Sequence, residues 1–206
     1  MSFASRERAA LVVTMRAVGP DAPTLCEGWT ARDLLAHLLL RERRLDSAAG
    51  ILLPFFAGRT RRVQNQIASQ DWDSMLAKLD GGAPWWSPMS WADALVNGLE
   101  MFVHHEDVRR AQDGWRPRQL SVGEQCWLSL FLVVGLFTYR QSPVRVVVAV
   151  RGGPRFVAKP FRPSTVRLLG EPSELLLHAL GRNSVELDYS GDIGDIALLD
   201  SAARAV

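Results

Sequence analysis

The sequence is poor in cysteine and has no apolar run long enough to cross a membrane. Its only cysteines, Cys26 and Cys126, are too few for a disulfide framework or a cysteine-based zinc module. The longest apolar stretch, residues 126–137, is shorter than the ~20 residues that span a bilayer, so we predict a buried core helix there. The N-terminal residues carry charges where a signal peptide has its apolar core. The sequence therefore predicts a cytoplasmic protein with no membrane partner.

An excess of charge of either sign is also lacking. The 24 Lys and Arg residues face 22 Asp and Glu residues, which leaves a net charge of only +2 and gives nucleic-acid binding no support. The apolar share of 48% and the charged share of 22% are typical of globular proteins and exclude global disorder.

The character of the sequence changes near residue 142, which predicts two domains, 1–141 and 142–206. The first part holds all seven tryptophans and reads as helices that begin at Ser or Thr caps. The second part begins with the β-branched run 144–150 and a Gly-Gly-Pro turn, which indicates a hairpin, further strands and one helix from Glu171 to Gly181. The predicted fold class is mainly α with a small α+β tail. In the first domain we expect helices up to Val18, from Thr30, over 60–79 with a break near Asp71, over 90–111 and over 121–139.

The most informative polar residues lie on the helix predicted over 90–111. Glu100 and His104 are four residues apart, so they share one helix face ~6 Å apart along the axis and could reach one metal ion. A second polar face with His105 lies opposite. A surface helix has one polar face, so we expect one of the two to face the bundle interior. The alternative is a surface Glu–His pair on an ordinary amphipathic helix. The stripe that contains the pair comprises Asp93, Asn97, Glu100, His104 and Asp107.

His37 is the candidate for a third ligand. It lies on the apolar side of the second helix, where a histidine is more often a core residue bonded to a backbone carbonyl. Two histidines and one carboxylate leave coordination positions open, which is typical of catalytic sites. Asp107 could accept the other ring N–H of His104, or it could instead pair with Arg109 or Arg110.

Two segments that contain these residues resemble a known protein family. The segment CEGWTARDLLAHL (26–38), followed after about sixty residues by EMFVH (100–104), resembles the metal-binding domain of the mycothiol-dependent maleylpyruvate isomerase family, in the DinB/YfiT-like superfamily of four-helix bundles. The resemblance implies that His37, Glu100 and His104 bind a divalent metal, usually zinc. The tail, through GEPSELLL (170–177), resembles the sterol-carrier-like domain often found with it. The variant HHEDVRR (104–110) resembles an actinobacterial subfamily known mainly as metal-binding proteins.

The resemblance also implies a chemistry. In that superfamily the metal lowers the pKa of a low-molecular-weight thiol, so that a thiolate attacks an electrophile. We therefore expect a mycothiol-dependent transferase or isomerase whose partners are a small-molecule thiol and a small electrophilic substrate. The alternative is a non-catalytic module that binds a metal or an apolar ligand. The catalytic residues, the residues that bind the thiol and the choice between a monomer and a homodimer stay open.

Other conspicuous residues have a structural explanation beside a functional one. Cys26 could be a nucleophile or a small buried loop residue. His105 is expected to face solvent, and His178 to be structural. Two arginine clusters could bind carboxylates or simply form solvated helix faces: Arg41, Arg43, Arg44 and Arg59, Arg61, Arg62. Four tryptophans could line a pocket mouth or only pack: Trp29, Trp85, Trp86 and Trp91.

Overall fold

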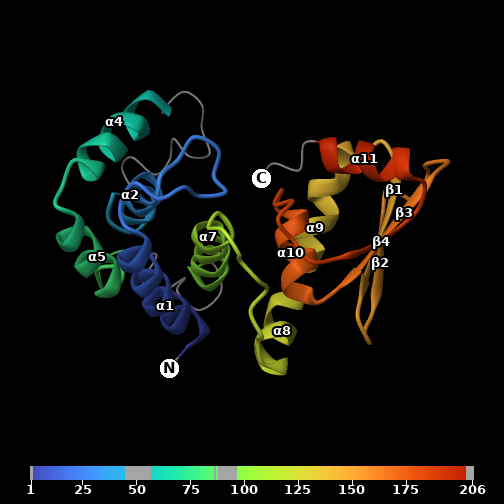
Figure 1. Cartoon of the computed structure of the whole chain (residues 1–206), viewed down its shortest axis with the longest axis horizontal. Coiled ribbons are helices and arrows are strands. Elements are labelled where there is room, and N and C mark those ends of the chain that lie inside the picture. Colours follow the sequence, from blue (N-terminus) through green and yellow to red (C-terminus); the bar gives the residue numbers. More distant parts are fainter. Residues whose placement is uncertain (1, 45–56, 86, 88–96, 203–206) are drawn as a thin grey trace. The chain divides into compact units, whose positions relative to one another are not determined.

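The computed structural model describes residues 2–44, 57–85, 87 and 97–202 (Figure 1). The chain divides into two compact units, Met1–Trp115 and Arg116–Val206, which are described separately below. The division lies before the predicted boundary near residue 141. The physical reason is that the helices of residues 122–138 pack within the second unit, as shown below.

The first unit is helical, and three of its described helices begin where the sequence predicts. The start predicted at residue 90 lies outside the described residues. Ser2 caps the first helix by accepting a hydrogen bond from the backbone N–H of Ser5. Thr30 and Asp33 form a reciprocal capping box at the second helix. The expected break near Asp71 is also observed, because Asp71 caps a new helix there. The described helices are α1 (Phe3–Val18), α2 (Ala31–Arg43), α4 (Ala57–Ala68), α5 (Trp72–Asp80) and α7 (Gly98–Arg110).

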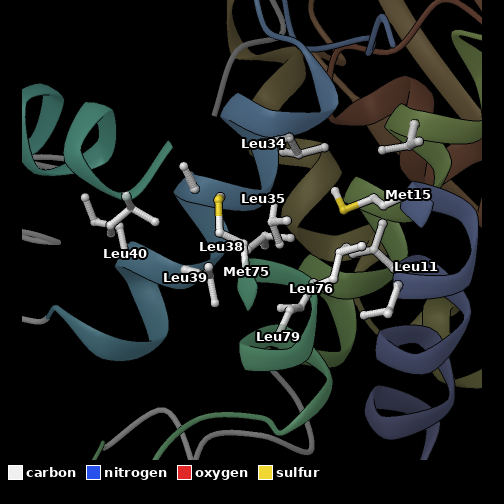
Figure 2. Close-up of a cluster of buried hydrophobic side chains, with 14 of the residues drawn as sticks. Leu11, Met15, Leu34, Leu35, Leu38, Leu39, Leu40, Met75, Leu76 and Leu79 are labelled. Carbon is white, nitrogen blue, oxygen red and sulfur yellow. The ribbon is translucent and has the colours of Figure 1, made fainter. Parts of the chain in front are cut away.

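A continuous apolar core joins these helices. The α1 helix packs against α5 and α7, while α2 packs against α4 and α5. Figure 2 shows leucines of α2 meeting residues of α1 and α5. Each fully buried leucine contributes about 1.5–3 kcal/mol relative to an exposed one. The core residues labelled in Figure 2 are Leu11, Met15, Leu34, Leu35, Leu38, Leu39, Leu40, Met75, Leu76 and Leu79.

Residues of both polar stripes of α7 are buried, among them His105 and Asp107, which corrects the expectation that the stripe with His105 faces solvent. His105 is buried, and its ring nitrogens lie 3.1 Å from Glu7 Oε2 and 2.9 Å from Thr14 Oγ1, both on α1. The expectation that His105 is solvent-facing is therefore wrong. The reason is that α1 presents polar partners to this face of α7, so that His105 is buried without losing its hydrogen bonds.

The second unit combines a four-stranded sheet with short helices. The strands are β1 (Arg145–Val150), β2 (Arg155–Ala158), β3 (Thr165–Gly170) and β4 (Asp188–Ser190). They follow the order β2-β1-β3-β4, with β1 parallel to β3 and the other pairs antiparallel. The predicted hairpin is observed, since Val147 of β1 pairs with Val157 of β2. The helices are α8 (Val122–Ser129), α9 (Leu132–Thr138), the 3₁₀ turn η3 (Tyr139–Gln141), α10 (Pro172–Ala179) and α11 (Ile193–Ser201).

The apolar stretch 126–137 is not the single buried helix that its composition predicts. The chain leaves the α-helical path between α8 and α9, and Leu130, Val133 and Phe137 are exposed. Leu128 and Leu132 are buried instead, because α8 and α9 pack against α10, and α9 also contacts β2. The predicted fold class, a helical bundle followed by a small α+β unit, is confirmed. Among the described residues, no helix is both long and apolar enough to cross a membrane.

Candidate metal centre

His37 is positioned by the start of α2 and by its apolar neighbours. The Thr30 capping box fixes where the helix begins, and the flanking Leu34 and Leu38 are buried in the core. This places the half-buried His37 at the edge of the core rather than inside it. The ring of Trp29 packs beside it, with 5.0 Å between the ring centroids.

The α7 helix supplies Glu100 and His104 to the same place. The centroids of the His37 and His104 rings are 5.7 Å apart, and His104 Nε2 lies 3.3 Å from Glu100 Oε2. One ligand atom from each of the three residues lies within 4.8 Å of the other two. The structure thus brings together the three residues that the sequence names as metal ligands.

Asp107 lies on the opposite side of the His104 ring. Its Oδ2 is 3.0 Å from His104 Nδ1, and its side chain is fully buried. Because a carboxylate can only accept, Nδ1–H of His104 donates this bond, and Nε2 is left facing Glu100 and His37. Burial disfavours a charge on His104, but the hydrogen bonds to Asp107, Cys26 and Glu100 outweigh it and hold its pKa well above the usual value.

Cys26 contacts this centre, which sequence reasoning did not foresee. Its thiol Sγ–H donates to Asp107 Oδ2 over 3.3 Å, and the backbone N–H of Leu25 donates to the carbonyl oxygen of Asp107 over 3.0 Å. The loop before α2 is thereby tied to α7. Cys26, His104 and Asp107 also form a second group of ligand atoms within 4.8 Å of one another. No pattern in the sequence pairs Cys26 with a residue eighty positions away.

Arg41 is the second residue whose place the sequence did not predict. It lies one turn after His37 on α2, and its guanidinium forms an ion pair with Glu100 Oε2. Arg43 of the same cluster has a structural role, because it donates hydrogen bonds of 2.8 and 2.9 Å to the carbonyl oxygens of Lys78 and Gly82. The cluster is therefore not simply a solvated helix face.

The charges around the centre follow from these contacts. Burial, then the neighbouring His104 and Arg41, lower the pKa of His37 to about 3, so that its ring is neutral at pH 7. Burial raises the pKa of Glu100, but the bond from His104 and the charge of Arg41 outweigh it and lower the pKa to about 2. The centre at neutral pH thus holds a neutral His37, an anionic Glu100 and a cationic His104.

The donor set fits a divalent ion of zinc type. Two imidazoles and one carboxylate are ligands that zinc prefers, and a three-residue set leaves a coordination position open. The hydrogen bond that Nδ1–H of His104 donates to Asp107 is the kind of contact that orients metal-ligating histidines.

The remaining candidates are placed elsewhere or lie outside the described residues. His178 is buried in the second unit, where its ring nitrogens lie 2.6 Å from Tyr139 Oη and 3.4 Å from Asp200 Oδ1, which agrees with a structural role. Trp85 is exposed, whereas Trp86, Trp91 and Asp93 lie outside the described residues. Asn97 is described and buried.

Comparisons with known proteins agree with this fold. Residues 4–70 match the family model of the mycothiol maleylpyruvate isomerase N-terminal domain, a range that contains His37 and Arg41. The crystal structure of the mycothiol-dependent maleylpyruvate isomerase aligns with a TM-score of 0.64 over 93% of this chain and 92% of that one, at 16% sequence identity. A mutant of that enzyme with a histidine replaced by alanine aligns with a TM-score of 0.63 at 14% identity, over 93% of this chain and 92% of that one. No curated protein sequence matches the chain. The predicted resemblance to this family is confirmed for residues 4–70, and the structural match shows that the fold is shared over most of the chain.

Proposed function

We propose that this chain, whose residues 4–70 match the mycothiol maleylpyruvate isomerase N-terminal domain, is a metal-dependent enzyme that uses a low-molecular-weight thiol. The reaction would be the isomerisation of a small electrophile or the transfer of the thiol to it, with mycothiol as the thiol. The observation that carries the proposal is the convergence of His37, Glu100 and His104, from two helices, within 4.8 Å of one another.

The three side chains suit the binding of one divalent ion, with zinc as the first choice. His37 is neutral at pH 7, so it can donate its lone pair without first losing a proton. Glu100 is anionic and offsets part of the charge of the ion. His104 is held by Asp107 with Nε2 directed at the other two residues. Each of the three residues can therefore offer one ligand atom to the same ion.

An ion bound by two histidines and one carboxylate keeps a net positive charge of about one and lowers the pKa of a thiol placed beside it. Buried apolar side chains of α7, Met101, Val103 and Val108, exclude water from the helix and strengthen electrostatic interactions near it. Trp29 covers the ring of His37.

The solved relative is named as a mycothiol-dependent maleylpyruvate isomerase, and the thiol is carried over from that name. The substrate is not carried over, because at 16% identity the likeness supports the fold and leaves the electrophile open.

A second candidate function is a binding module, and one feature of the second unit favours it. A cleft of about 680 Å³ lies between α8, the β1–β2 turn and the start of α10. Val122, Val150 and Pro172 are among its lining residues, which would suit an apolar ligand. In this reading the metal would be structural and no thiol would react.

The two functions are separated by a thiol-transfer experiment on the full chain, purified without a His-tag and loaded with zinc. Mycothiol is added, thiolate absorbance is recorded, and transfer to a generic electrophile is followed. We expect both signals with the wild type and neither with Glu100→Ala or His104→Ala. Glu27→Ala, which removes an exposed carboxylate in the same unit, is the matched control and should behave like the wild type. Stoichiometric zinc without thiolate formation or transfer would establish the binding module instead.

A further inference from the structure

Arg41 lies at the candidate metal centre without belonging to its ligand set. It contacts Glu100 through Oε2, which is the same oxygen that lies 3.3 Å from Nε2 of His104. The guanidinium and the His104 ring thus meet at a single carboxylate oxygen. Arg41 would therefore be a cationic neighbour of an ion that recruits this oxygen.

The exposure of the side chains shows on which side the centre opens to solvent. The exposed fraction is 0% for Asp107 and 11% for His104, but 20% for Arg41 and 29% for Glu100. The exposed fraction of the side chains therefore rises from the Asp107 side of the His104 ring to the Arg41 side. Among these residues, Arg41 and Glu100 are the ones that an incoming small molecule meets first.

The balance of charges favours the binding of an anion to Arg41 once the centre holds an ion. A divalent cation and a guanidinium would then share the single negative charge of Glu100, and two cations a few ångströms apart repel each other. An anionic group on the incoming molecule removes this repulsion. The planar guanidinium of arginine can donate two parallel hydrogen bonds to a carboxylate. Among the anionic groups of small metabolites, only phosphate fits it comparably well.

We propose that Arg41 is a specificity-determining residue. When a molecule binds at the open position of the ion, the guanidinium of Arg41 leaves Glu100 and pairs instead with a carboxylate of that molecule. The inference rests on the proposed metal centre and adds to it a substrate class, carboxylate-bearing thiols or electrophiles. Arg41 itself neither binds the ion nor takes part in bond making.

The first test uses cobalt(II)-loaded protein, in which a bound thiolate gives a charge-transfer absorbance. Mercaptobutyrate and mercaptobutanol carry the same thiol and differ in the carboxylate. The wild type should bind mercaptobutyrate about tenfold more tightly, the size expected for one charge-assisted hydrogen-bonded pair. Arg41→Gln should lose this preference, and Arg41→Lys should keep part of it. Arg61→Gln, the same charge change on an exposed position of α4, should keep all of it.

A second arm assigns the carboxylate to the thiol or to the electrophile. It keeps mercaptobutanol as the thiol and compares the rates of transfer to iodoacetate and iodoacetamide. If the electrophile carries the carboxylate, Arg41→Gln lowers the iodoacetate rate relative to the iodoacetamide rate about tenfold. If Arg41→Gln loses the preference for the carboxylate-bearing compound in either arm, the proposal is supported. The arm in which the preference is lost shows whether the thiol or the electrophile carries the carboxylate.

The outcomes distinguish this inference from the proposed function. Arg41→Gln should bind cobalt at least as tightly as the wild type, because a cation that competes for Glu100 is gone. If thiols bind cobalt but Arg41→Gln changes neither preference, the assignment of Arg41 is overturned and the metal centre stands. If neither thiol gives a charge-transfer band with stoichiometric cobalt, the proposed function fails and the assignment of Arg41 fails with it.

Discussion

Nδ1 of His104 and Oδ2 of Asp107 lie 3.0 Å apart, within one turn of α7, and the aspartate is fully buried. The bond fixes the ring so that its other nitrogen faces Glu100 and His37. Since Asp107 is itself held by Cys26 and by the backbone of Leu25, the orientation of the histidine depends on the loop before α2.

This relationship predicts a graded loss of metal affinity. Asp107→Ala should weaken zinc binding about 10–100-fold, because the histidine keeps its ligating nitrogen but loses its orientation. His104→Ala should abolish most of the affinity. Competition with a chromophoric chelator measures both. Asp113→Ala, at an exposed position just after α7, is the control and should bind zinc like the wild type.

The adjacent histidines His104 and His105 should respond to substitution in opposite ways. His105→Ala removes hydrogen bonds to Glu7 and Thr14, so it should lower the free energy of unfolding by about 1–3 kcal/mol. It should leave the zinc stoichiometry unchanged, whereas His104→Ala should remove the zinc. Thermal unfolding and metal analysis of the two purified variants test this pair. A loss of zinc in His105→Ala without loss of the fold would place the centre on the other face of α7.

Zinc binding should release about one proton per ion at neutral pH. The pKa of His104 is raised, so this ring is protonated in the metal-free protein, while His37 and Glu100, with pKa values of about 3 and about 2, already have a free lone pair and lose no proton on binding. The affinity should therefore rise with pH until the pKa of His104 is passed and then level off. Calorimetric titration in buffers of different ionisation enthalpy counts the protons. Release of none would contradict the protonated state of His104.

The same raised pKa has a consequence for the metal-free fold. A protonated His104 stabilises the folded state at pH values below the ordinary pKa of histidine, and this contribution is lost as the pH rises through the raised value. Denaturant unfolding of the wild type and of His104→Ala across that range should show the two free energies converging at high pH. A difference that stays constant with pH would contradict the assignment.

Core substitutions in the first unit should follow burial. Leu76→Ala removes a fully buried side chain between α1, α2 and α5, and should cost about 2–5 kcal/mol. Leu130→Ala removes an exposed side chain of the second unit and should change stability by less than about 0.5 kcal/mol. Tryptophan fluorescence follows the first unit well, because six of the seven tryptophans lie in residues 1–115.

The parts of this structure that follow local rules could be predicted from the sequence. Ser and Thr caps located the helix starts, and the i, i+4 spacing of Glu100 and His104 placed both on one face of α7. Their meeting with His37 depends on the packing of two helices, and it was expected only because the two segments resemble a known family. Periodicity could show two polar stripes on α7, but it could not show that α1 carries partners for His105.

Long-range polar contacts account for what was missed at the centre. Arg41 meets Glu100 across two helices, and Cys26 meets Asp107 across eighty residues, so neither pairing leaves a pattern in the sequence. The exposed leucine and phenylalanine of the apolar stretch 126–137 have a similar cause. Composition predicts burial, but which side of α8 and α9 is covered depends on where α10 packs.

The metal content of the tag-free protein, purified and then equilibrated with zinc, tests the central claim most directly. Elemental analysis should find one zinc per chain in the wild type and in Asp113→Ala. It should find almost none in His37→Ala, Glu100→Ala or His104→Ala when each variant retains its helical circular dichroism. A folded wild type without zinc, or a zinc that persists in all three ligand variants, would contradict the account.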